Sequence, residues 1–407
     1  MSNPFANLTA PAPLLATNRP NRRESPPPPY IINQPTPPLL KEWAPNRAPT
    51  STDSDRTITS ASDDSHRSTL KRIAKETLTA IREGGYSYQG IGQDLAEAIK
   101  DAKSKTVYYS PSSYIKRWAS STQPNPTHSS PTHISILHIT ALDAARRLNN
   151  IYMGNPFDSG KIGILNFASP RKPGGNFKNG SESQETSIAR SSTLHSSLKA
   201  DEAQHFYKVY TRRNAKIPAA YYLNSHGMIY SPNICIFRDD DGNWTYPLLV
   251  DVLSCSAVNA GKVLKANGGI TSRQEMEIEK EMSERMGRIL YLFERKGVRN
   301  IILGAFGTGV FRNSVTTVAR IWAHLLLLPE ARFKDSFDRV IFAIKGEETF
   351  EDFQTAFDAW KPRITELEQS SKRNSDMLSL TSARSSPQQS RWPSVWLEAT
   401  HGPGSDA

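Results

Sequence analysis

Hydrophobic residues recur along the middle of the chain with two different spacings, one typical of helices and one typical of strands. From Leu70 to Ile81, apolar side chains return every three or four residues and Gly84 ends the run, so we expect an amphipathic helix. The continuous apolar run KIGILNFAS, residues 161–169, is typical of a strand buried on both faces. The pattern predicts further strands at 106–109, 134–139, 228–237, 246–253, 299–306 and 340–344. It predicts helices at 94–102, 141–150, 274–296 and 350–360, and two more helices that end near Lys199 and Pro329.

Strands and helices that alternate in this way favour an α/β fold with a mixed sheet flanked by helices. We expect this core domain at 105–361, preceded by a helical extension at 67–104 that packs on it. Residues 1–66 hold 13 of the 28 prolines, and 362–407 return to Ser, Gln, Arg and Pro. Because such segments bury too little apolar surface to offset their ordering entropy, we expect both tails to be disordered.

One part of the first tail has a pattern of its own, PPPPY at Pro26–Tyr30. Consecutive prolines favour a polyproline II helix, which docks into grooves lined by aromatic side chains. A plain linker is the simpler interpretation of the same residues.

Charge and cysteine content narrow the classes of function. The net charge of +10 favours polyanionic partners such as nucleic acid, phosphorylated ligands or acidic membrane surfaces, and is equally compatible with a scattered, solvated surface. Two cysteines, Cys235 and Cys255, form neither a disulfide framework nor a zinc site and suit a reducing compartment. The first residues are a poor signal peptide and no apolar run is long enough to cross a bilayer, so we expect a soluble protein without membrane contact.

The segment ILNFASPRKPGGNF, residues 164–177, is the first candidate for chemistry. A buried strand ends at the polar Asn166, and the following loop contains Gly174 and Gly175. Adjacent glycines let the backbone approach a ligand and turn its N–H groups toward an anion. The alternative is a turn that only needs positive φ.

The second candidate is a helix start at residues 181–192, with Gln184 and Glu185 in its first turn. The positive end of a helix stabilises a carboxylate and attracts an anion. The alternative is that Glu185 only complements the helix dipole.

The third candidate is GAFGTGVFRNS, residues 304–314, where a strand runs into glycines and then into a helix capped by Ser314. This arrangement is typical of a phosphate-binding loop, although it is neither a Walker A motif nor a dinucleotide fingerprint. Phe311 would then pack against a ribose or a base, or alternatively belong to the core of the turn.

Other classes of site find little support. Asp239–Asp241 precede Gly242 and indicate a hairpin turn rather than a metal site. The histidines lack metal-ligand spacing, and no G-x-S-x-G elbow precedes a helix. We therefore expect no metal and no cofactor.

Taken in order, these segments resemble the microbial-type poly(ADP-ribose) glycohydrolase family. The matches are NFAS, PGG, Gln-Glu at a helix start, IYSP with FRDD, SxxAVNAG and GAFGTGVFRN, which span most of residues 105–345. The resemblance implies a macrodomain-like fold that binds ADP-ribose in a cleft at the strand ends, where open α/β sheets bind ligands. It places at the ligand Asn166, Gly174, Gly175, Asn176, Gln184, Asn259, Gly307, Thr308, Gly309, Val310 and Phe311.

The chain departs from the family pattern at two positions. The family has three glycines followed by Gln-Glu-Glu, in which the last Glu is the general acid that protonates the departing ribose oxygen. Here Asn176 takes the third glycine position and Thr186 takes the position of the acid. Because a threonine hydroxyl is no workable acid near neutral pH, and general acids typically contribute 10²–10⁴-fold, we expect the usual chain-cleaving reaction to be badly impaired.

Three functions are compatible with this departure. The first is an ADP-ribosyl hydrolase of altered specificity, in which Glu185 acts as acid or positions water for a leaving group that needs less protonation. The second is an ADP-ribose reader without turnover, and the third is a scaffold whose tails matter most. The expected partners are ADP-ribose, ADP-ribosylated protein or ADP-ribosylated nucleic acid, and the expected location is intracellular, in the cytoplasm or nucleus.

Overall fold

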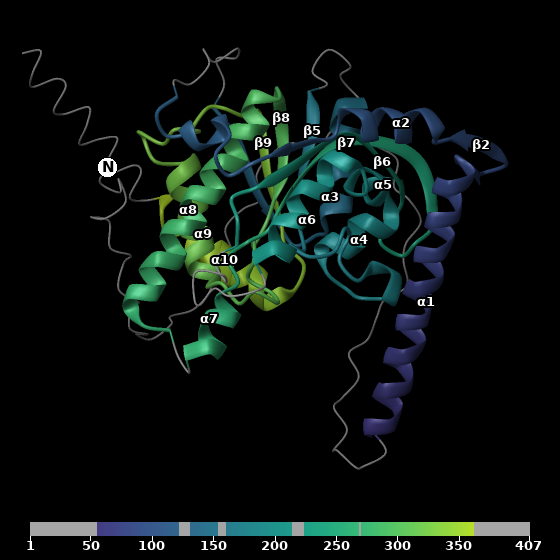
Figure 1. The fold of residues 1–407 in the computed structure, drawn as a ribbon, viewed down its shortest axis with the longest axis horizontal. Coiled ribbons are helices and arrows are strands. Elements are labelled where there is room, and N and C mark those ends of the chain that lie inside the picture. Colours follow the sequence, from purple (N-terminus) through teal and green to yellow (C-terminus); the bar gives the residue numbers. More distant parts are fainter. Residues whose placement is uncertain (1–54, 122–130, 154–159, 214–223, 268–269, 362–407) are drawn as a thin grey trace, which may run out of the picture.

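The computed structural model describes residues 55–121, 131–153, 160–213, 224–267 and 270–361, and its centre is a seven-stranded mixed sheet (Figure 1). The strand order is β3-β6-β7-β5-β8-β9-β4. The five strands from β7 to β4 are parallel, whereas β6 and β3 pair antiparallel at one edge. The predicted α/β class with a mixed sheet is confirmed. The strands are β3 (Val107–Tyr109), β4 (His133–Leu137), β5 (Lys161–Phe167), β6 (Met228–Arg238), β7 (Trp244–Cys255), β8 (Val298–Leu303) and β9 (Arg339–Ala343).

Helices cover both faces of this sheet, as predicted. One face carries α7 (Ala260–Asn267), α8 (Ser272–Arg295), α9 (Val315–Leu326) and α10 (Glu347–Asp358), which share a hydrophobic core with the strands. The other face carries α2 (Ala96–Lys105), α3 (Ala141–Met153), α4 (Gln184–Ser191), α5 (Leu194–Leu198) and α6 (Asp201–Arg213).

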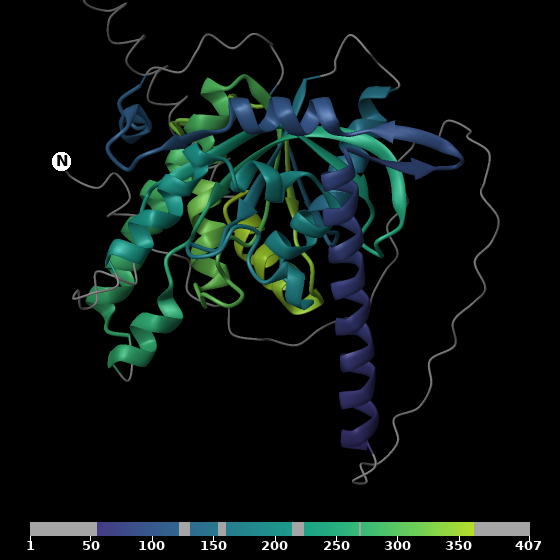
Figure 2. The ribbon, with the colours of Figure 1, turned by 45° about the vertical axis from the view of Figure 1, so that its right-hand side comes forward.

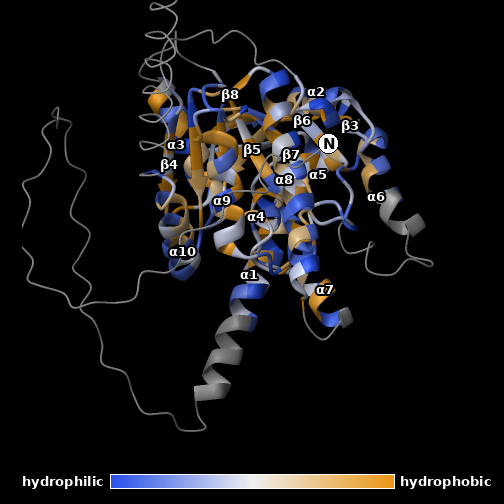
Figure 3. Cartoon of the chain, turned by 90° about the vertical axis from the view of Figure 1, so that its left-hand side faces the viewer, coloured by the Kyte–Doolittle hydropathy of each residue, from blue (hydrophilic) through white to orange (hydrophobic). Residues whose placement is uncertain are grey.

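The strands in the middle of the sheet explain why the sequence there is apolar without interruption. Successive side chains of a strand point to opposite faces, and here each face meets a helical layer. Ile164 of β5 belongs to one core and Leu165 to the other, and Ile302 and Ile301 of β8 divide in the same way. Figure 3 shows this apolar character concentrated on the strands and on the helix faces against them.

The first helix, α1 (Asp55–Glu83), begins earlier than the predicted boundary between 66 and 67, so part of the segment expected to be disordered is helical. Residues 64–69 are exposed, and buried side chains start at Leu70. Hydrophobic spacing can reveal a helix only where it buries a face, so the exposed residues 64–69 carried no signal for a helix. Figure 2 shows the N-terminal end of α1 extending away from the domain.

A two-stranded hairpin, β1 (Gly85–Tyr88) and β2 (Ile91–Asp94), follows α1 and was not predicted. Its strands contain Gly85 and Gly92, and glycine has a low strand propensity, so the pattern resembled a loop. The rest of the predicted tails, including Pro26–Tyr30, lies outside the described residues. Within the described part of the chain, no helix has the length and apolar composition needed to cross a bilayer.

Most of the remaining predicted elements are confirmed with small shifts of their ends. The helix expected to end near Lys199 is instead two helices, α4 and α5, and α6 and α7 were not predicted. Ser314 caps α9 as expected, because its side chain accepts a hydrogen bond from the Thr317 N–H. Thr140 likewise precedes α3 and its Oγ1 accepts from the Asp143 N–H over 3.0 Å.

Candidate functional site

Three loops meet at the edge of the sheet where the parallel strands β7, β5 and β8 end. The loop after β5 is tied to the end of β7, because the Ala168 N–H donates to the Cys255 carbonyl over 2.9 Å. The loop after β8 touches the one after β7: a methyl group added at Gly307 would lie 2.4 Å from Ala257 Cβ. Ligands of open α/β sheets bind at this edge, and the three loops contain most of the residues that the sequence singled out.

The glycine loop after β5 lies directly on the start of α4. Gly174 and Gly175 both have left-handed backbone angles, with φ of 69° and 60°. A methyl group at Gly175 would lie 2.9 Å from Glu185 Oε2 and 3.3 Å from Thr186 Cγ2, so glycine is required by space as well as by conformation. The third position, Asn176, has φ of −101° and is exposed, so this backbone does not need glycine there.

Gln184 fixes the start of α4 against β5. Its side-chain oxygen accepts from the Phe167 N–H over 2.9 Å, and its amide donates to the Leu165 carbonyl over 2.6 Å. The side chain thus pairs with the end of β5 as a neighbouring strand would. A glutamate could not do this, because it offers no donor for the carbonyl.

Glu185 is a buried carboxyl group, only 3% exposed. Its Oε2 accepts from the Ser169 N–H over 2.8 Å, whereas Oε1 is buried without a hydrogen-bond partner among the described residues. Burial raises the pKa of Glu185 to about 8, against the opposing effects of the Ser169 N–H, the Asn166 amide and the Gly174 N–H. Burial therefore favours the protonated form of this carboxyl group.

Thr186 is the third residue of α4 and takes part in its capping box. The Ser183 N–H donates to Thr186 Oγ1 over 2.7 Å, and the Thr186 N–H reaches Ser183 Oγ over 3.3 Å. Thr186 Oγ1 also donates to the Ser181 carbonyl over 2.8 Å, and the residue is 2% exposed. The hydroxyl group therefore helps to begin the helix, as capping-box residues do.

The two asparagines predicted at the ligand have different surroundings. Asn166 is fully buried in β5 and its amide donates to Ser254 Oγ over 2.9 Å, while its oxygen has no partner in the described part of the chain. Asn259 lies just before α7, and its side-chain oxygen accepts from the Lys262 N–H over 3.0 Å. Asn166 thus lies beneath the site, and Asn259 caps a helix beside it.

The loop after β8 is anchored at Gly307, whose φ is 79°. The Asn313 amide donates to the Gly307 carbonyl over 2.9 Å and to the Val258 carbonyl over 2.8 Å, which joins this loop to the one after β7. Thr308 Oγ1 donates to the Ala305 carbonyl over 2.9 Å and tightens the turn.

Beyond this anchor the loop is open. A methyl group at Gly309 would meet nothing within 4 Å, and Val310 is 87% exposed. Phe311 packs partly against the core and remains partly exposed, and its carbonyl accepts from the Gly261 N–H over 2.9 Å. The exposed tip is the part of the loop that a ligand can reach.

Arg285 of α8 supports the site and was not identified from the sequence. It is fully buried, and its guanidinium donates to the Ser256 carbonyl over 3.0 Å and to the Asn224 carbonyl over 3.4 Å. The Asn224 amide in turn donates to Ser256 Oγ over 3.2 Å and to the Ala257 carbonyl. The available signal was an arginine adjacent to Met286 on the apolar face of a long helix.

Asp239–Asp241 form the predicted turn between β6 and β7: the Asp239 N–H donates to the Asn243 carbonyl over 3.0 Å. Asp240 also accepts from Thr140 Oγ1 over 2.5 Å and from Ser187 Oγ over 2.9 Å, so the turn holds the first turns of α3 and α4. Among the described residues, no group of His, Cys, Asp or Glu side chains is arranged to hold a metal ion.

Comparison with known proteins identifies relatives of this chain. Residues 74–239 match the family described as microbial-type PARG, catalytic domain. The chain is 30% identical to the poly(ADP-ribose) glycohydrolase from Thermomonospora curvata, covers 98% of that chain with 71% of its own length, and superimposes with a TM-score of 0.62. The same relative has been solved with the inhibitor ADP-HPD, at a TM-score of 0.60.

A second solved relative is the poly(ADP-ribose) glycohydrolase from Deinococcus radiodurans in complex with ADP-ribose. It is 28% identical, with 64% of this chain and 97% of that chain covered and a TM-score of 0.55. No curated protein matches the sequence.

Proposed function

Because the chain belongs to the microbial-type poly(ADP-ribose) glycohydrolase family, we propose that it binds ADP-ribose and hydrolyses a glycosidic bond to it, on a linkage other than the one between units of an ADP-ribose chain. The proposal has two parts, a ligand cradle and an acid. Each part draws on different residues and is tested separately.

The cradle consists of the glycine loop after β5 and the loop after β8. Gly174, Gly175 and Gly307 all have positive φ, which brings backbone to the edge of the sheet without side chains in the way. The relatives solved with ADP-ribose and with ADP-HPD support ADP-ribose as the ligand. We assign to the same cradle the nearby Asn176, Thr308, Gly309, Val310 and Phe311, with Asn166, Gln184 and Asn259 supporting it.

The acid is Glu185, and its raised pKa is the observation that carries the proposal. A carboxyl with a pKa of about 8 still holds its proton at neutral pH and can give it to a leaving atom. Water then adds to the anomeric carbon and its proton restores the carboxyl. The products are free ADP-ribose and the unmodified acceptor.

Thr186 is the reason for proposing that the substrate linkage differs from the one between units of an ADP-ribose chain. Its hydroxyl is engaged by Ser183 and Ser181 at the helix start and is no acid at neutral pH. A ribose oxygen is a poor leaving group unless an acid protonates it strongly. A nucleobase nitrogen, an acyl oxygen or a protonated side chain departs with less proton donation. Modified proteins and nucleic acids carry such linkages, and a net charge of +10 suits an acidic substrate. We place this activity in the cytoplasm or nucleus.

An ADP-ribose reader is the second candidate, and the enclosure of Glu185 favours it. The carboxyl lies beneath Gly175 and is 3% exposed, so a proton reaches the ligand only if the glycine loop moves. Binding at the loops requires no such movement.

A release assay with matched variants separates these candidates. The substrates are ADP-ribose chains, mono-ADP-ribosylated protein and ADP-ribosylated nucleic acid, and the readout is free ADP-ribose. Glu185→Gln removes the acid and keeps the shape of the side chain. Glu182→Gln is the control, because Glu182 lies just before α4 and is half-exposed, with its carboxylate 2.8 Å from His66 Nε2.

Release from protein or nucleic acid that Glu185→Gln abolishes and Glu182→Gln preserves supports the enzyme. Calorimetry showing ADP-ribose binding together with no release from any substrate supports the reader. Absence of binding at millimolar ADP-ribose overturns both candidates.

A further inference from the structure

The segments that meet at the candidate site carry charges of almost one sign. Residues 168–183, 256–267 and 304–314 contain six basic residues and one acid, whereas the whole chain contains 50 Lys and Arg against 40 Asp and Glu. The one acid, Glu182, has its carboxylate 2.8 Å from His66 Nε2 of α1. We call the six basic residues the basic rim: they are Arg171, Lys172, Lys178, Lys262, Lys265 and Arg312.

The residues of the basic rim lie at the surface of the glycine loop, of α7 and of the loop after β8. All are exposed except Lys262, which is partly buried. Lys172 Nζ donates to Asn176 Oδ1 over 3.1 Å, next to the glycines of the first loop. The Arg312 side chain lies along the start of α7, since a methyl group added at Gly261 would lie 3.2 Å from Arg312 Cδ. The loop after β8 and α7 therefore present their cations together.

The basic rim extends past the ADP-ribose cradle at both ends. At one end Lys178 lies next to Asn179, whose carbonyl accepts from Arg67 Nε of α1 over 3.0 Å. At the other end Lys265 lies in the last turn of α7. Figure 1 shows α1 and α7 on opposite sides of the domain. Because the backbone N–H groups of glycine loops can bind a pyrophosphate by themselves, a rim of this length exceeds what ADP-ribose alone requires.

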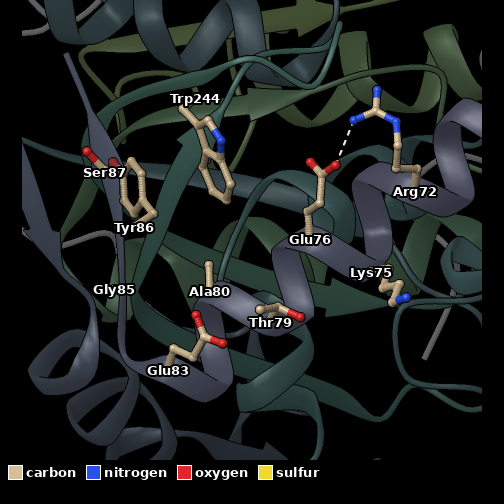
Figure 4. A pocket seen from close by; sticks show the side chains of 10 residues that line it. All are labelled: Arg72, Lys75, Glu76, Thr79, Ala80, Glu83, Gly85, Tyr86, Ser87 and Trp244. Atoms are coloured by element: carbon tan, nitrogen blue, oxygen red, sulfur yellow. Dashed lines mark hydrogen bonds and ion pairs between the residues drawn. The ribbon is translucent and has the colours of Figure 1, made fainter. Parts of the chain in front are cut away.

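A hollow elsewhere on the molecule has balanced charges instead. It encloses 510 Å³ between α1 and β1, away from the candidate site. Figure 4 shows that Arg72 and Lys75 line it together with Glu76 and Glu83, and Arg72 donates to Glu76 over 2.6 Å. This surface suits no particular sign of ligand, whereas the basic rim favours a polyanion.

We propose that the basic rim binds the backbone phosphates of a nucleic acid strand, so that the substrate is nucleic acid carrying ADP-ribose. The inference rests on the proposed function, because the bound ADP-ribose decides which nucleotide lies at the loops. Phosphates recur along a strand at regular intervals, and cations spread over a surface can each contact one of them. A modified protein has no regular row of anions, so it gains little from a rim that extends on both sides of the cradle.

The salt dependence of binding tests this proposal in the full-length chain with Glu185→Gln, which removes the proposed acid and so spares the ligand. The ligands are free ADP-ribose, an ADP-ribosylated single-stranded oligonucleotide, an ADP-ribosylated peptide and an ADP-ribose chain. The double variant Lys178→Gln and Lys265→Gln removes one cation at each end of the rim. The double variant Lys75→Gln and Lys100→Gln is the matched control, because both lysines are exposed and lie on α1 and α2.

Each phosphate of a single strand that a protein cation neutralises adds roughly 0.7 to the magnitude of the slope of log affinity against log salt concentration. We therefore expect the rim variant to lower this magnitude for the oligonucleotide by about 1.4 and to weaken its binding about tenfold at low salt. The control variant should change neither quantity. Free ADP-ribose, which the cradle binds, should bind both double variants about equally.

Equal effects of the two double variants on the oligonucleotide overturn the proposal. A rim effect on the peptide or on the ADP-ribose chain that matches the effect on the oligonucleotide overturns it too, because the rim would then serve another partner. An oligonucleotide that binds no more tightly than free ADP-ribose overturns this inference and leaves the proposed function standing. A chain that binds no ADP-ribose at all overturns the proposed function, and this inference with it.

Discussion

The backbone of Gly175 rests on the carboxyl group of Glu185: a single methyl group at Gly175 would lie 2.9 Å from Glu185 Oε2. The glycine loop and the Glu185 side chain are therefore packed directly against each other. Changes to either residue should be felt by the other.

Gly175→Ala tests this contact. We expect a loss of about 1–2 kcal/mol of unfolding free energy from the left-handed backbone alone, with a further loss from contact with Glu185, and weaker ADP-ribose binding. Gly309→Ala is the control for stability alone, since a methyl group there meets nothing within 4 Å and needs no unusual φ. Urea unfolding and calorimetry measure the two effects. Equal stability of the two variants contradicts the packing argument.

The raised pKa of Glu185 predicts a dependence of stability on pH. The group titrates near 4.5 in the unfolded chain and near 8 in the folded one, so between these values only the folded state holds the proton. The contribution of Glu185 to stability therefore falls with rising pH across this window, by up to about 1.4 kcal/mol per pH unit. Glu185→Gln lacks this titration, so its unfolding free energy should increase relative to that of the native chain from pH 5 to pH 8. The unfolding free energy of Glu182→Gln should show no such relative increase. A constant difference across the window would show that Glu185 titrates normally.

If Glu185 is the acid, release of ADP-ribose should show the same titration. Activity should be high on the acid side and fall as pH rises through about 8, because the carboxyl loses its proton there. Initial rates from pH 6 to 9.5 measure this. A rate that rises through pH 8 is incompatible with Glu185 as proton donor.

Thr186→Glu tests whether the missing acid explains the altered function. Glutamate at the third position of a helix keeps a capping box with Ser183, so we expect the variant to fold and to gain cleavage of ADP-ribose chains by about 10²-fold or more. Thr186→Gln caps in the same way and supplies no acid, so it should gain nothing. Gel analysis of labelled chains gives the result. Equal behaviour of the two variants would mean that more than the acid has been lost.

Arg285 is expected to position the loop after β7. Arg285→Lys cannot reach both the Ser256 and Asn224 carbonyls, and we expect ADP-ribose affinity to fall about tenfold. Arg288→Lys is the control, because Arg288 is a buried arginine on the same helix that binds Glu284 and the Pro111 carbonyl instead. Both variants should lose roughly 1.5–3 kcal/mol of unfolding free energy, because hydrogen bonds to charged groups typically contribute this much to stability. An equal loss of ADP-ribose affinity in both variants would show that Arg285 acts only by stabilising the fold.

Much of the fold could be predicted because buried positions recur at regular intervals in the sequence. Strands covered on both faces are apolar throughout, as in residues 161–169, and helices with one buried face repeat every three to four residues. The hairpin at 85–94 and residues 64–69 of α1 bury too little to produce such a pattern.

The sequence could predict the loops of the candidate site, because their glycines mark local backbone turns. It could not predict contacts between side chains that are distant along the chain. Glycines between a strand and a helix indicate a loop that approaches a ligand, and Gly174, Gly175 and Gly307 do have positive φ. The burial of Glu185 and the contacts of Arg285 depend on which elements meet in space. No local pattern around residue 185 or 285 contains that information.

Asp240 ties the turn between β6 and β7 to two elements that come much earlier in the chain. Asp240 joins Thr140, 100 residues earlier, and Ser187, 53 residues earlier. Contacts so distant along the chain close large loops and carry a high entropic cost, so they form after local structure. The turn between β6 and β7 therefore ties together parts of the chain that are far apart in sequence, and one of them is the helix that carries Glu185.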